Sequence, residues 1–213
     1  MKKYLAEFFG TYILVFCGTG AIIINELSNG VITHLGVSLT FGAVVLAMIH
    51  TFGDISGAHI NPAVTLAFGI SGKMDKKEII PYISWQVLGA LMASITLKYL
   101  FPKSLNLGST LPSGEPMQSF ILEIILSFIL MLVIINVSKG AKEKGITAGI
   151  AISSVVAMEA IFAGPISGAS MNPARSIGPA IISGNFFSLW IYLTAPIIGA
   201  VFAVLLEKIM HRN

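Results

Sequence analysis

Residues 56–65 read SGAHINPAVT and residues 167–176 read SGASMNPARS, and the two stretches are identical at Ser-Gly-Ala and at Asn-Pro-Ala. A match of this length does not arise from composition, so the chain contains an internal repeat. An apolar segment with an early glutamate precedes each copy, with Glu7 in the first half and Glu123 in the second. The chain therefore consists of two related halves.

The two halves cover about residues 1–100 and about 116–213, and the linker 101–117 contains Gly, Pro and Ser. Neither a second type of domain nor a low-complexity tract interrupts this pattern. We expect residues 1–213 to form a single transmembrane domain.

The composition is that of a membrane protein. The chain is 55% hydrophobic and 11% charged, with a mean hydropathy of +0.86, which leaves too few charges to cover a water-soluble surface. Six nearly charge-free stretches come close to the length of about 20 residues that crosses a bilayer core or exceed it. They are residues 8–25, 27–53, 79–97, 116–138, 145–163 and 187–206. The sequence predicts an all-α membrane protein with six transmembrane helices.

Each half holds three of these spans, which is an odd number. The halves must enter the membrane from opposite faces and form an inverted repeat, and short interrupted segments at corresponding positions of such repeats indicate the permeation site. The segments 55–72 and 164–183 are the two that fit this description, since Gly and Pro break each of them near its start.

Each short segment contains a helix start signal. Asn61 and Asn172 are good N-caps, and Pro62 and Pro173 follow at the favoured first helical position, before the small Ala63 and Ala174. We expect re-entrant half-helices over 61–72 and 172–183, each about 18 Å long and roughly half of the hydrocarbon core. Their N-termini meet at mid-membrane, where the irregular lead-ins 56–60 and 167–171 line a water-filled cavity.

The positive charges set the orientation. With a cytoplasmic N-terminus, ten of the thirteen Lys and Arg residues fall on the inner side, which satisfies the positive-inside rule. They are Lys2, Lys3, Lys73, Lys76, Lys77, Lys139, Lys142, Lys144, Lys208 and Arg212. The basic pI near 9.0 therefore reflects topology, and we expect no nucleic-acid partner. Both termini are expected in the cytoplasm.

The sequence contains no sign of an enzyme, a metal site or a cofactor. Neither a nucleophile–base pair nor a phosphate-binding glycine loop is present. His34, His50 and His59 lack metal-ligand spacing, and the single cysteine, Cys17, is expected to pack in an apolar run. Small residues four apart predict close helix approach at Gly89 with Ala93, Gly145 with Gly149 and Gly199 with Ala203.

The paired SGAHINPAVT and SGASMNPARS, with Arg175 directly after the second Asn-Pro-Ala, closely resemble the aquaporin or major intrinsic protein family. The resemblance covers all six spans and both half-helices. The stretch FAGPISGASMNPARSIGPA is most similar to the nodulin-26-like subgroup and its prokaryotic relatives.

The resemblance implies a homotetramer in a plasma or inner membrane, with one pore in each protomer. It also implies that Asn61 and Asn172 donate hydrogen bonds to the permeating molecule, and that Phe41, Ala160, Ala169 and Arg175 form an outer constriction. Water channels of the strict type usually have histidine where this chain has Ala160. The expected function is a passive channel for water and small uncharged solutes such as glycerol, urea or metalloid hydroxides, which excludes protons and ions.

Three alternatives stay open: a strictly water-selective channel, a coupled secondary transporter, and a membrane scaffold with a sealed core. A strictly water-selective channel is favoured by Ser176, because dedicated glycerol channels usually carry aspartate at that position. A coupled secondary transporter would use the intramembrane carboxylates Glu7, Glu123 or Glu159. The matching positions of Glu7 and Glu123 favour instead that they accept hydrogen bonds from the lead-in backbone, and the roles of Glu159 and Asp54 stay open.

Overall fold

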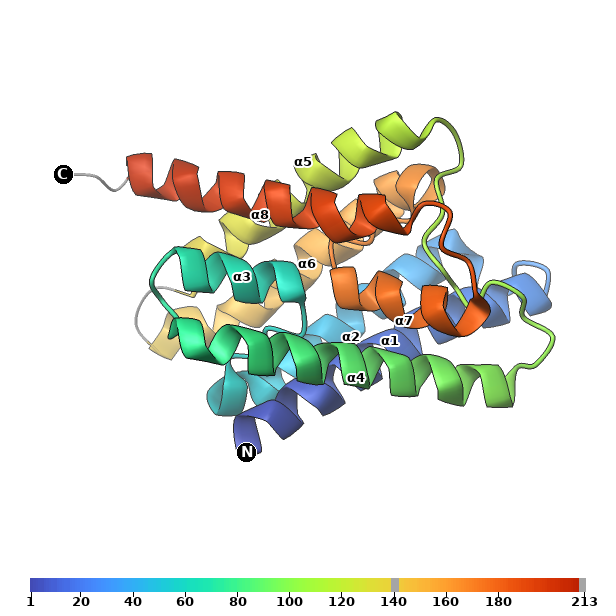
Figure 1. Cartoon of the computed structure of the whole chain (residues 1–213), viewed down its shortest axis with the longest axis horizontal. Helices are drawn as coiled ribbons and strands as arrows, with labels where there is room; N and C mark the ends of the chain where they lie inside the picture. The colour runs from blue at the N-terminus through green and yellow to red at the C-terminus, as the bar shows by residue number, and fades with distance from the viewer. Residues whose placement is uncertain (139–141, 211–213) are drawn as a thin grey trace.

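The computed structural model describes residues 1–138 and 142–210, without the side chains of 142–146. Lys139 and Arg212, for which the sequence made predictions, lie outside this description, and so do the side chains of Lys142 and Lys144 and the packing of Gly145. The described residues form eight helices and no strand (Figure 1). These are α1 (Lys2–Leu27), α2 (Thr33–Ser56), α3 (Pro62–Ile70), α4 (Lys76–Leu100), α5 (Pro116–Val137), α6 (Lys142–Ser167), α7 (Pro173–Ser183) and α8 (Leu189–Met210).

Six of the helices are long and apolar enough to cross a membrane, as the sequence predicted. Their ends differ from the charge-free windows, because a helix continues into the polar layer as long as its backbone bonds are made. α1 begins at Lys2, six residues before the predicted span. The second predicted span began too early: α2 starts at Thr33, because Asn29 and Gly30 form a turn with φ of 55° and 94°.

The helix contacts repeat between the two halves. α1 packs against α2 and α4 in the first half, α5 packs against α6 and α8 in the second, and α2 meets α6 across the halves. A Cβ atom at Gly89 would overlap the carbonyl oxygen of Phe8, and one at Gly199 would overlap that of Ile124. Ala93 and Ala203 are fully buried, so both described pairs of small residues stand where helices approach closely, as predicted.

The two short helices lie within the bundle. α3 and α7 both contact α4 and α8, and they contact each other; in Figure 1 they lie nearly end to end between those two longer helices. α7 ends at Ser183, as expected, but α3 ends at Ile70, two residues before the predicted end. The reason is a turn, in which the Ser71 N–H still bonds to Ala67 O and Gly72 takes a φ of 76°.

Candidate functional site

The two lead-ins have the same unusual backbone conformation. Positive φ angles occur at Gly57 (85°), Ala58 (46°) and Ile60 (43°), and again at Gly168 (82°), Ala169 (41°) and Met171 (52°). A positive φ is costly for a residue with a side chain, and most costly for a β-branched one such as Ile60. Such a conformation persists only where the surrounding structure holds it.

The carboxylate of Glu7 accepts hydrogen bonds from the first lead-in. Its Oε1 accepts from Ser56 Oγ (2.6 Å) and His59 N (2.9 Å), and its Oε2 accepts from Ile60 N (2.7 Å) and Gln86 Nε2 (2.7 Å). The glutamate is fully buried in α1. Because a buried carboxylate with four donors is well satisfied, the interaction compensates for the strained backbone.

Glu123 occupies the equivalent place in the second half. Its Oε1 accepts from Ser167 Oγ (2.7 Å) and Ser170 N (2.8 Å), and its Oε2 accepts from Met171 N (2.8 Å). The last two N–H groups of each lead-in therefore point to a carboxylate. Most residues of the two lead-ins also line a cavity.

Asn61 and Asn172 each make two kinds of contact. Asn61 Oδ1 caps α3 by accepting from Ala63 N (2.9 Å), and Asn172 Oδ1 caps α7 by accepting from Ala174 N (3.0 Å) and Arg175 N (3.3 Å). The side-chain nitrogens cross to the other half: Asn61 Nδ2 donates to Met171 O, and Asn172 Nδ2 donates to Ile60 O, both at 2.8 Å. The opposite lead-in thus takes one amide hydrogen of each asparagine, and the second one has no partner among the described residues and can donate to a molecule in the cavity.

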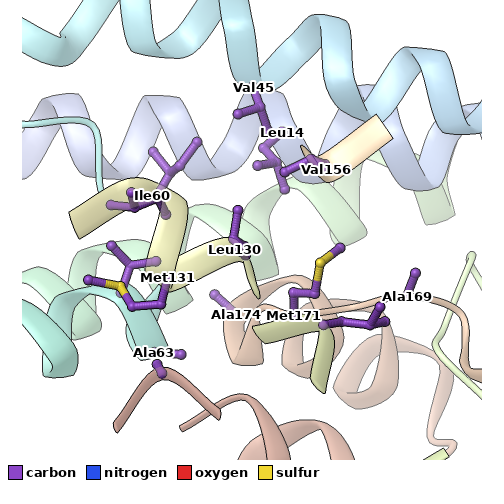
Figure 2. Close-up of a cluster of buried hydrophobic side chains, with 14 of the residues drawn as sticks. Leu14, Val45, Ile60, Ala63, Leu130, Met131, Val156, Ala169, Met171 and Ala174 are labelled. Carbon is purple, nitrogen blue, oxygen red and sulfur yellow. The ribbon is translucent and has the colours of Figure 1, made fainter. Parts of the chain in front are cut away.

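A cavity of about 170 Å³ runs past these asparagines. One water molecule needs only about 15 Å³ on such a measure, so the cavity has room for several. Its wall is mostly apolar, and Figure 2 shows Leu14, Val45, Leu130 and Val156 gathered near Ile60 and Met171. Its polar groups come chiefly from the lead-ins, Asn61, Asn172 and Arg175.

All four residues expected at the outer constriction line this cavity. The side chains of Ala160 and Ala169 are single methyl groups. Arg175 belongs to the first turn of α7. The Arg175 Cζ lies 5.1 Å from the centroid of the half-buried Phe41 ring, within cation–π range. The structure thus brings the four positions to one cavity from α2, α6, the second lead-in and α7.

Several residues that hold the site were missed from the sequence. Gly108 O accepts from Arg175 Nη1 (2.9 Å), and Thr110 Oγ1 donates to Ser176 Oγ (2.8 Å). Both partners lie in the stretch that the sequence showed only as a polar linker, and nothing in its composition identified them. Gln86, which donates to Glu7, likewise gave no sequence signal.

The remaining candidates have varied surroundings. Glu159 is fully buried, does not line the cavity, and neither carboxyl oxygen has a hydrogen-bond partner among the described residues. Asp54 is exposed and does not line the cavity.

His59 packs in the lead-in, with Nδ1 3.1 Å from Thr65 Oγ1, but it also lines the cavity. Cys17 packs against the main apolar cluster, as predicted, and the described residues contain no group of potential metal ligands.

Comparison with known proteins gives consistent results. The family model described as "Major intrinsic protein" matches residues 1–207. Aquaporin NIP1-1 of Zea mays is 46% identical over 202 residues, which cover 94% of this chain and 72% of that protein. Nodulin-26 of Glycine max is 41% identical, with 94% of this chain and 74% of that protein covered.

The solved structures include a similar fold. The X-ray structure of the aquaglyceroporin from Plasmodium falciparum matches with a TM-score of 0.88 at 26% identity, covering 99% of this chain and 96% of that one. Fold, motifs and relatives agree. The chain belongs to the major intrinsic protein family and is a multi-pass membrane channel for water and small solutes, not an enzyme.

Proposed function

We propose that the chain is a passive pore for water and for small uncharged solutes of the size of glycerol, urea or a metalloid hydroxide. The observation that carries this proposal is that one cavity is lined by both asparagines, both lead-ins and all four constriction positions. In this proposal Asn61 and Asn172 mark the midpoint of the pore, and Phe41, Ala160, Ala169 and Arg175 line its constriction. The other residues of the two motifs, Pro62, Ala63, Pro173 and Ala174, are buried at the starts of the half-helices and do not line the cavity.

Ions are rejected by charge and by desolvation. Each half-helix places about half a positive charge at its N-terminus, and the two N-termini face the same part of the cavity. Arg175 adds a permanent charge at the constriction, and an apolar wall offers few groups to replace an ion's hydration shell. Cations meet repulsion, whereas a neutral molecule that hydrogen-bonds passes.

Protons are rejected by the orientation of water at the midpoint. The remaining amide hydrogen of Asn61 and of Asn172 is available to a water molecule in the cavity. A water that accepts from both amides turns its oxygen toward them, so it cannot continue a chain that carries protons. This role needs one free amide hydrogen on each asparagine. The hydrogen bonds to Met171 O and Ile60 O use only one hydrogen of each side chain and leave the other.

The size of the constriction favours a solute larger than water. Ala160 and Ala169 project little into the cavity, so Arg175 can bind hydroxyl or amide groups while Phe41 faces the carbon side of the solute. The structural relative described as an aquaglyceroporin supports the same solute class. Ser176 is buried, and its hydroxyl is hydrogen-bonded to Thr110 and Ser170. It does not line the cavity, so a serine at this position does not by itself exclude glycerol.

Assembly and orientation complete the proposal. We expect a homotetramer in a plasma or inner membrane, with both termini in the cytoplasm. Positive charges at one end of the bundle support this orientation: Lys3 pairs with Glu78 (2.8 Å), Lys73 Nζ donates to Ile135 O, and Lys208 Nζ donates to Ile70 O (both 3.2 Å). Mass determination by light scattering in detergent tests the tetramer.

Flux measurements on purified protein in liposomes test the function. An impermeant osmolyte should cause fast shrinkage, and glycerol or urea should cause shrinkage followed by fast reswelling. A coupled transporter would accumulate solute under a proton or sodium gradient, and a sealed membrane scaffold would give only the background leak. Either of those results would overturn the proposal.

A further inference from the structure

Gly18 in α1 lies directly behind the aromatic ring of the constriction. A Cβ atom at Gly18 would overlap Phe41 Cε1 and would lie 2.5 Å from Cζ and 2.7 Å from Cδ1. Real Cβ contacts are not that short, so any side chain larger than hydrogen would have to displace the ring.

The ring has few directions in which to move. The Arg175 guanidinium covers it at 5.1 Å. Next to the ring, the backbone of α2 packs closely against α6. A Cβ at the neighbouring Gly42 would lie 2.7 Å from Ala157 Cβ and 3.0 Å from Ser153 O. With α1 behind the ring and α2 pinned against α6, the open direction is the cavity that Phe41 already lines.

We propose that Gly18 is a specificity-determining residue that acts through Phe41: the missing side chain at Gly18 leaves a notch that keeps the ring out of the pore. This inference rests on the proposed function, since it takes Phe41 as a wall of the constriction. It extends the set of residues that fix the aperture from those that line the pore to one in α1 that does not. A solute is therefore selected in part by the packing of α1 on α2.

The test compares Gly18→Ala with Gly20→Ala. Both glycines are buried in α1, but a Cβ at Gly20 meets only Leu97 Cδ2, at 3.3 Å, in an apolar cluster away from the cavity. In proteoliposomes, Gly18→Ala should lower glycerol permeability relative to water roughly tenfold, equivalent to about 1.4 kcal/mol of added barrier. Gly20→Ala should match the native protein, and equal behaviour of the two variants would overturn the inference.

A Phe41→Ala background shows whether the effect passes through the ring. There, adding Gly18→Ala should change neither permeability, because the colliding atoms are gone. A reduction as large as in the native background would overturn the inference. If Gly18→Ala alone does not fold, a folded and conducting double variant supports the collision, and a double variant that also fails to fold contradicts it.

A different result would show that the proposed solutes are wrong while leaving the role of Gly18 testable. If the native protein passes water but neither glycerol nor urea, the wide constriction is wrong, and the same variants are compared by water permeability. A loss with Gly18→Ala that disappears in the Phe41→Ala background then supports the role of Gly18, and no loss overturns it.

Discussion

Asn61 Nδ2 donates a 2.8 Å hydrogen bond to the carbonyl oxygen of Met171, a residue 110 positions later in the chain. Together with the reciprocal bond from Asn172 to Ile60, it joins the two half-helices where their N-termini meet. Each asparagine therefore caps its own helix, links the two halves and retains one hydrogen for the cavity.

Replacing Asn61 or Asn172 with leucine should strongly reduce water permeability. The change removes the cap, worth about 1 kcal/mol, removes the link to the other half, and puts an apolar group at the midpoint. Stopped-flow light scattering of proteoliposomes after an osmotic step measures the effect. Unchanged shrinkage in both variants would show that the midpoint is elsewhere.

Replacing Glu7 with glutamine should destabilise the protein by about 2 kcal/mol or more, because the amide nitrogen would face donors that now bond to a carboxylate oxygen. The same holds for Glu123. Thermal unfolding in detergent, followed by size exclusion, measures the loss. Glu26→Gln is the control, since Glu26 lies exposed on the same helix as Glu7. Equal melting temperatures of Glu7→Gln and Glu26→Gln would contradict the claim that Glu7 stabilises the lead-in.

Removing the charge of Arg175 should open a cation leak. In Arg175→Val, the guanidinium that bonds to Gly108 O and covers Phe41 is lost, so repulsion at the constriction falls. A pH-sensitive dye inside the vesicles reports proton entry under an imposed potential. Arg175→Lys, which keeps a positive charge, should remain tight, and equal leaks in the two variants would mean that the charge does not exclude cations.

Glu159→Gln should leave water permeability within about twofold of native, and transport should not respond to a proton gradient. The carboxyl group is buried off the cavity wall and has no hydrogen-bond partner among the described residues, so a neutral amide of the same shape costs little. Gradient-driven solute uptake that Glu159→Gln abolishes would support the transporter alternative.

The paired motif was sufficient to predict the half-helices, because an Asn cap followed by Pro is a local signal and the parity of three spans is a count along the chain. The end of α3 and the start of α2 were missed because turns at Gly72 and at Asn29 to Gly30 override the apolar pattern. Gly18, Gly108 and Gln86 act through contacts between distant segments, and a single sequence gives no local sign of such contacts.

The most direct measurement compares glycerol and water permeability of the native protein with those of Ala160→His. Ala160 lines the cavity with a methyl group, so an imidazole there narrows the constriction. The account predicts that native proteoliposomes pass both molecules, and that Ala160→His reduces glycerol permeability far more than water permeability. A native protein that passes water but no glycerol, urea or metalloid hydroxide, or a variant that loses both permeabilities equally, would contradict it.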